Sequence, residues 1–180
     1  MPSFGSETGN VLYLIVCAAP PARDTPELVK QLRSDGWDVC VIATPASLRW
    51  IDTDELTTLT GHVVRSEYRG PDEEEFIPRG DAILLAPATF NTVNKWVAGI
   101  SDSLALGLLN EALGSELPVL AVPVINDALM AHPAVGRSFE VLEAAGVELS
   151  PRRSIDPIVL ATNLIDLMAR HDDQRARQRH

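Results

Sequence analysis

Continuous apolar runs alternate along this chain with segments of helical periodicity. Unbroken apolar runs are typical of strands that are buried on both faces of a sheet. Such runs predict strands at residues 11–17, 37–43, 81–86 and 117–122, with a short strand at 147–149 and a weaker candidate at 61–66. Helical patterns cover residues 25–35, 46–50, 53–59, 91–99, 102–113, 133–145 and 156 to about 170.

Local signals mark the ends of several predicted helices. Thr25 followed by Pro26 predicts an N-cap and a first helical position, and Gly36 predicts the end of that helix. Asp156 before a proline predicts the cap of the last helix. The acidic, proline-flanked stretch 69–79 predicts a loop.

Alternation of buried strands with helices predicts an α/β fold, a three-layer α/β/α sandwich around a doubly wound parallel sheet of the Rossmann or flavodoxin type. We expect residues 1–10 to be a disordered start, residues 11–170 to form one domain and residues 171–180 to be a polar tail. Ligands of such sheets bind beyond the carboxyl ends of the strands. The loops that matter therefore begin near Ala18, Thr44, Pro87 and Pro123.

Composition narrows the possible partners and the compartment. A formal net charge of −10 argues against a nucleic-acid partner, which needs clustered Lys and Arg. The two cysteines, Cys17 and Cys40, lie inside apolar runs and are expected to be buried free thiols in a reducing compartment. With no signal-peptide pattern and no membrane-length apolar run, we expect a cytoplasmic protein. We expect no metal site.

Two loops after buried strands are rich in amide and hydroxyl side chains. The first reads APATFNTVNKWVAGISD over residues 86–102, and the second reads PVINDALM over residues 123–130. Taken alone, their Thr and Asn residues are equally suited to a structural role, as helix N-caps or turn residues, and to contact with a ligand. Together the two blocks resemble the pattern of the FMN-containing cysteine decarboxylases, the family that includes phosphopantothenoylcysteine decarboxylase. The similarity spans residues 11–151.

The resemblance implies a non-covalently bound FMN at the carboxyl edge of the sheet. It also implies that Asn126 holds the carboxylate of a small-molecule or peptide substrate, with Met130 beside it, because an amide can donate to a carboxylate without adding charge. The residues implied to contact the cofactor are Ala18, Ala19, Thr44, Ser47, Pro87, Thr89, Phe90, Asn91, Thr92, Val124 and Ile125.

Assembly also follows from the resemblance, which implies a homotrimer or a multiple of trimers with the flavin between subunits. Phe90 and Trp96 are the bulky apolar candidates for that contact. Packing in the core is the alternative for Trp96.

The chain departs from the family pattern at its phosphate loop and at its catalytic groups. Residues 17–22 read CAAPPA where the family has a T-G-S-x-A turn, so Ala18 and Ala19 replace the glycine and the serine, and Pro20 and Pro21 lack backbone donors. The family histidine expected shortly before Asp81 is replaced by the acidic residues 72–75. We interpret these residues as a solvated loop, with a lid over a basic or amine substrate as the alternative. No cysteine follows Pro151, where the decarboxylases have a proton donor.

Two of the four histidines, His62 and His132, come into question for that role, and neither fills it by its position. His62 reaches the site only if its loop folds back, and an exposed or capping role is the main interpretation. His132 stands at a helix start, where a structural role is expected. The catalytic residues are therefore unassigned.

Several functions fit these observations. The leading one is an FMN-binding flavoprotein that acts on a small carboxylate but lacks the standard decarboxylase groups. The alternatives are a decarboxylase of a peptide's C-terminal cysteine with an unrecognised base, a non-catalytic flavin-binding subunit, and, ranked last, flavin prenyl transfer.

Overall fold

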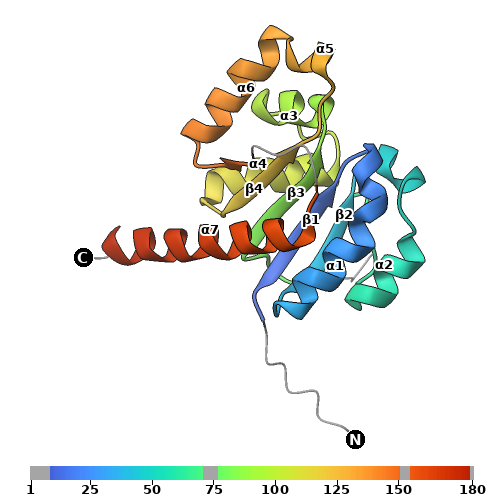
Figure 1. Cartoon of the computed structure of the whole chain (residues 1–180). Helices are drawn as coiled ribbons and strands as arrows, with labels where there is room; N and C mark the ends of the chain where they lie inside the picture. Colours follow the sequence, from blue (N-terminus) through green and yellow to red (C-terminus); the bar gives the residue numbers. More distant parts are fainter. Residues whose placement is uncertain (1–8, 71–76, 151–154, 179–180) are drawn as a thin grey trace, which may run out of the picture.

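A parallel sheet of five strands forms the centre of the molecule (Figure 1). The computed structural model describes residues 9–70, 77–150 and 155–178. In spatial order the strands are β2 (Asp38–Ala43), β1 (Val11–Val16), β3 (Ala82–Ala88), β4 (Val119–Pro123) and β5 (Glu148–Leu149). Every residue of β1, β3 and β4 is buried, which confirms that the apolar runs are strands covered on both faces.

Helices cover both faces of the sheet and confirm the predicted three-layer α/β/α sandwich (Figure 1). Leu12 and Leu14 point to one face, and Tyr13 and Ile15 to the other, as the two-residue period of a strand requires. The first face packs against α1 (Thr25–Ser34), α2 (Thr53–Thr60) and α7 (Pro157–Gln178). The second packs against α3 (Phe90–Val97), α4 (Leu104–Ser115) and α6 (Pro133–Ala144).

Three short elements follow the carboxyl ends of strands. They are the 3₁₀ helices η1 (Pro20–Asp24) after β1 and η2 (Pro45–Arg49) after β2, and the single-turn α5 (Asp127–Met130) after β4. The chain moves outward from β1 to β2 and then crosses back to β3 on the other side of β1. The topological switch point, where open α/β sheets bind ligands, therefore lies between β1 and β3.

The strand predicted at residues 61–66 is wrong. A single parallel bridge between Ile42 and Arg65 is the pairing found there. In it the backbone N–H of Arg65 donates to the Val41 carbonyl at 3.1 Å, and the N–H of Ala43 donates to the Arg65 carbonyl at 2.7 Å. This segment protects the edge of β2 at one point without extending the sheet.

Two predicted helix ends also need correction. Thr25 does not cap α1: it is the first helical residue, and its hydroxyl donates to the Ala22 carbonyl at 2.6 Å. The last helix continues to Gln178, so most of the expected polar tail is helical. Its predicted cap is confirmed, since the Asp156 carboxylate accepts from the N–H groups of Ile158 and Val159, both at 3.1 Å. Of the disordered start expected at residues 1–10, residues 1–8 lie outside the described residues, as do the acidic residues 72–75. Asn10 is described, and its carbonyl accepts from the N–H of Asp38 at 3.0 Å.

Cys17 and Cys40 are buried free thiols, as predicted. Within residues 9–70, 77–150 and 155–178, no helix combines the length and apolar character needed to cross a membrane.

Candidate functional site

A cleft of about 890 Å³ opens at the carboxyl edge of the sheet, by the switch point between β1 and β3. In Figure 1 the carboxyl ends of the strands are at the top of the sheet. Its walls come from the segments that follow β1, β2, β3 and β4, together with the start of α4. Two hollows of about 610 and 800 Å³ lie beside α7 at the opposite edge, where the strands begin. Because ligands of parallel sheets bind at the carboxyl edge, the first cleft is the candidate site.

Most residues that the sequence assigned to a cofactor line this cleft. They come from four separate loops, which the sheet brings together. The lining members of the predicted set are Ala18, Ala19, Thr44, Thr89, Phe90, Asn91, Thr92, Val124, Ile125 and Asn126.

Ser47, Pro87 and Met130 do not line the cleft. Ser47 is buried, and its hydroxyl donates to the Thr44 carbonyl at 2.8 Å, so it holds the start of η2 in place. Pro87 lies within β3, where its carbonyl accepts from the N–H of Cys17 at 3.2 Å. Met130 ends α5, one residue beyond Leu129, which does line the cleft. In this structure all three support the walls from behind or beside them.

The start of α3 presents unsatisfied backbone donors to the cleft. Thr89 occupies the N-cap position with extended backbone angles, but its side chain accepts no hydrogen bond from the helix. Instead its hydroxyl donates to the Thr92 hydroxyl oxygen at 3.3 Å. The first N–H groups of α3 are therefore left for a ligand.

The Cys17 thiol lies beneath this helix start. Its Sγ donates to the Thr92 Oγ1 at 3.2 Å, and its side chain is fully buried. Burial raises the pKa of the Cys17 thiol above its usual value, with smaller opposing effects from hydrogen bonds to Thr92 and Thr89. The thiol is therefore a protonated structural group at neutral pH, and not a nucleophile.

The two polar atoms of the Asn126 side chain have different surroundings. Its Oδ1 accepts from the N–H of Leu129 at 2.9 Å and caps α5. No described residue accepts a hydrogen bond from its Nδ2 amide group, and the side chain is exposed at the rim of the cleft. The capping role and the proposed carboxylate-binding role therefore use different atoms and are compatible.

The lining residues outside the predicted set include Lys95, Asp102, Ser103 and Leu106. Lys95 Nζ forms an ion pair with Asp102 Oδ2, which joins α3 to the loop before α4. Both residues belong to the first recognised sequence block, and their opposite charges at a spacing of seven residues were the available signal.

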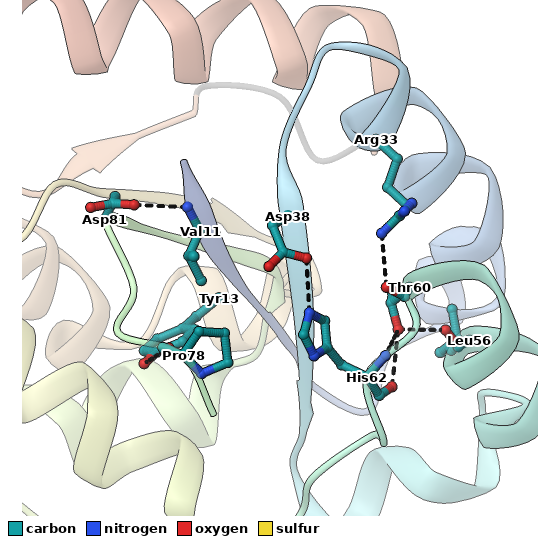
Figure 2. Close-up of polar contacts among 9 residues, drawn as sticks. All are labelled: Val11, Tyr13, Arg33, Asp38, Leu56, Thr60, His62, Pro78 and Asp81. Carbon is teal, nitrogen blue, oxygen red and sulfur yellow. Dashed lines mark hydrogen bonds and ion pairs between the residues drawn. The ribbon is translucent and has the colours of Figure 1, made fainter. Parts of the chain in front are cut away.

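His62 and His132, the two histidines considered as catalytic candidates, do not line the cleft. Figure 2 shows His62 Nε2 paired with Asp38 Oδ1 at 2.8 Å. Asp38 begins β2, so His62 sits at the edge of the sheet opposite the cleft. His132 Nδ1 accepts from the N–H of Ala134 at 3.1 Å and caps α6, which confirms its structural role. No histidine lines the cleft among the residues the structure describes.

The cleft has the size and the partly apolar lining of a small-molecule site. Its volume lies within the range of about 300–1,000 Å³ that is usual for small-molecule sites. Phe90, Leu106, Val124 and Ile125 give it apolar surface against which an aromatic ring can pack. Where the structure is described, no group of three His, Cys, Asp or Glu side chains is placed to hold a metal ion.

Comparison with known proteins identifies the family. A model of the flavoprotein family matches residues 5–173. This chain belongs to the flavoprotein family. That membership confirms the suspected relationship and agrees with the position of the cleft, at the switch point of a flavodoxin-like sheet.

Relatives of known activity share only part of their length with this flavoprotein. The Escherichia coli K12 coenzyme A biosynthesis bifunctional protein CoaBC is 27% identical over 185 residues, which cover 92% of this chain and 44% of that protein. A cysteine/cysteine sulfinic acid decarboxylase from an unknown prokaryotic organism is 39% identical over 97 residues, 51% of this chain and 26% of that protein. The chain thus spans less than half the length of these curated relatives.

Solved structures share the fold over nearly their whole length. The FMN-dependent cysteine decarboxylase TvaF from thioviridamide biosynthesis superposes with a TM-score of 0.74 at 24% identity, covering 89% of this flavoprotein and 98% of that chain. A PPC decarboxylase complexed with pantothenoylaminoethenethiol gives a TM-score of 0.71 at 17% identity, covering 87% and 96%. At these identities the comparison confirms the fold.

Proposed function

We propose that this flavoprotein binds FMN in the carboxyl-edge cleft and holds a small carboxylate-containing substrate beside it through Asn126. The observation that supports the proposal most strongly is the convergence of the segments after β1 to β4 on one cleft. Apolar walls suit the ring, the hydroxyl of Thr44 suits the ribityl chain, and the free Nδ2 of Asn126 suits a carboxylate. When bound, the flavin would supply the redox chemistry, and the protein would position the substrate against it.

The residues that line the cleft are suited to binding and orienting a substrate, and few of them are suited to transferring a proton. The titratable side chains that line the cleft, among described residues, are Lys95 and Asp102, and they are paired with each other. The nearby Cys17 thiol is buried and committed to Thr92. A substrate whose reaction depends mainly on the flavin, and little on a protein base, fits this site best.

Two alternative functions each have an observation in their favour. The similarity to proteins named as cysteine decarboxylases favours decarboxylation of a C-terminal cysteine, with a base still to be identified. The lack of a histidine among the described lining residues favours a flavin-binding subunit without its own catalysis. Carbon dioxide release from a cysteine-ending peptide would separate the first alternative from the second.

Assembly into homotrimers, or multiples of trimers, is part of the proposal. Large apolar side chains are exposed beside the cleft: Leu48 is 41% exposed, Ile100 42% and Leu129 38%. The interpretation of Trp96 as a contact residue is wrong, because it is 1% exposed and its Nε1 donates to the Leu109 carbonyl at 2.9 Å in the core. A monomeric mass in light scattering would contradict the trimer.

Purification without added cofactor tests the function directly. We expect a yellow protein whose absorbance spectrum shows the usual flavin bands, and FMN in the supernatant after denaturation. A colourless protein that binds no added flavin would refute the proposal. The two buried thiols support a reducing compartment, and we propose the cytoplasm as its location.

A further inference from the structure

We propose that the cleft recognises a flavin through its ring and ribityl chain and gains little from the terminal phosphate, so that riboflavin and FMN bind with similar affinity. This inference rests on the proposed flavin site and describes what that site selects. It follows from three properties of the cleft: its charge, its backbone donors and the helix starts that open into it.

The cleft has no uncommitted positive charge among the described residues that line it. Lys95 is the one cationic side chain in that set, and it is paired with Asp102. Arg23, at the end of η1, does not line the cleft, and its guanidinium lies 5.3 Å from the centre of the Trp50 ring. The whole chain carries a formal charge of −10, which repels a phosphate dianion at low salt.

Backbone donors are also scarce where phosphates usually bind, at helix starts. Pro20 and Pro21 begin η1 and have no N–H, and the N–H of Ala19 already donates to the Cys17 carbonyl at 3.0 Å. Pro45 begins η2 in the same way. The start of α5 is capped by Asn126 and carries the acidic Asp127 in its first turn.

The start of α4 is capped by the Ser103 hydroxyl, which accepts from the N–H of Leu106 at 3.3 Å, and the acidic Asp102 precedes it. The start of α3 is the remaining uncapped donor group. One exposed helix start attracts an anion by an amount that corresponds to about a two- to fivefold gain in affinity. Besides Thr89 and Thr92, which bond to each other, the hydroxyl side chains of Thr44 and Ser103 line the cleft. The ribityl hydroxyls, which both flavins carry, can accept hydrogen bonds from them. We therefore expect FMN to bind less than about tenfold more tightly than riboflavin.

Parallel titrations test the inference. The quenching of flavin fluorescence is measured for riboflavin and for FMN on the same purified, flavin-free protein. A preference for FMN below about tenfold is expected, and a larger preference would overturn the inference while leaving the flavin site intact. If neither flavin binds, the proposed function itself fails, and the inference fails with it.

Salt dependence gives a second, independent result. A phosphate bound by cations loses affinity as salt rises, whereas a phosphate repelled by a negative protein does not. We expect the affinity for FMN, relative to riboflavin, to fall by less than about fivefold between low and high salt, because the start of α3 is the one attraction that salt would screen. A larger fall would overturn the inference.

A charge-neutral double variant tests the role of the ion pair. Lys95→Met combined with Asp102→Asn removes both charges and keeps the net charge of the cleft at zero. The ratio of FMN to riboflavin affinity should change by less than about threefold, because the paired Lys95 contributes little to phosphate binding. A selective loss of FMN affinity beyond about tenfold would show that Lys95 binds the phosphate, and would overturn the inference.

Discussion

Asn126→Asp separates the two roles of this residue more cleanly than a truncation would. In the structure Oδ1 caps α5 and Nδ2 points to no described acceptor. Aspartate keeps the capping oxygen and is as good an N-cap as asparagine. It removes only the donor and places a negative charge at the rim of the cleft. Asn126→Ala, in contrast, removes both the cap and the donor.

The size of the effect can be worked out from the position of the side chain. Two unit charges about 4 Å apart repel by about 1 kcal/mol in water and about 4 kcal/mol at the effective dielectric near a protein surface. Because Asn126 is exposed, the lower value applies. Loss of a hydrogen bond to a charged group adds about 1.5 kcal/mol. The sum, about 2.5 kcal/mol, is about a 70-fold loss of affinity for a carboxylate ligand.

Calorimetry with the flavin-loaded protein measures this effect. The ligand is a short peptide ending in cysteine, and the same peptide with a C-terminal amide serves as the control. The affinity for the peptide with a free carboxylate should fall about 70-fold in Asn126→Asp and about tenfold in Asn126→Ala. The affinity for the amidated peptide should differ little between the variants. Both variants should still bind FMN.

Melting temperatures of the same variants complete the test. Asn126→Asp should melt like the wild type, and Asn126→Ala should lose about 0.5–2 kcal/mol of stability with its cap. If Asn126→Asp bound the acid peptide as tightly as the wild type does, Asn126 would be a structural cap and nothing more.

Three further predictions concern other parts of the molecule. His62→Ala should leave flavin affinity unchanged, because His62 lies at the opposite edge of the sheet; a parallel loss of flavin binding, measured by fluorescence titration, would contradict this placement. Gly80→Ala should cost about 1–3 kcal/mol in urea unfolding, because its Cβ would lie 2.8 Å from the Tyr13 ring. Gly114→Ala, with nothing within 4 Å, is the matched control and should be neutral or stabilising. Burial raises the pKa of Cys40 to about 12 from an ordinary value of 9.0, so unfolding releases a proton between these values and stability should fall as pH rises above 9.0. Cys40→Ala should make that fall shallower, and an identical pH profile would refute the assignment.

Much of the fold follows from local patterns that burial enforces. Strands covered on both faces must be apolar at every position, and β1 and β4 satisfy this requirement without interruption. Once the parallel sheet is inferred, the carboxyl-edge loops must converge. The positions of Thr44, Thr89 and Asn126 around one cleft were therefore predictable from the sequence.

Other features depend on contacts that a local pattern does not contain. Residues 61–66 are apolar enough for a strand, but the Thr60 hydroxyl accepts from the N–H of His62, and His62 pairs with Asp38 (Figure 2). These bonds hold the start of the segment in a turn, and only Arg65 reaches the edge of β2. The local bonding of this segment thus outweighs its strand propensity.

Trp96 and the end of α7 show the same limit in different ways. The Nε1 of Trp96 finds its partner at Leu109 on a different helix, which a sequence cannot reveal, so a buried tryptophan resembled an interface residue. The polar composition of residues 171–178 led to the prediction of a tail, although their sequence contains a local helix signal. Asp173 and Arg177 have the i, i+4 spacing that supports a helix.

One flavin titration tests the central claim that the carboxyl-edge cleft is a flavin site. Wild-type protein is compared with Ala18→Trp, which fills the cleft, and with Val63→Trp, which adds the same side chain at a 53% exposed position outside it. We predict that wild type and Val63→Trp quench FMN fluorescence at micromolar protein and that Ala18→Trp does not. Quenching by all three proteins, or by none of them, would contradict the account.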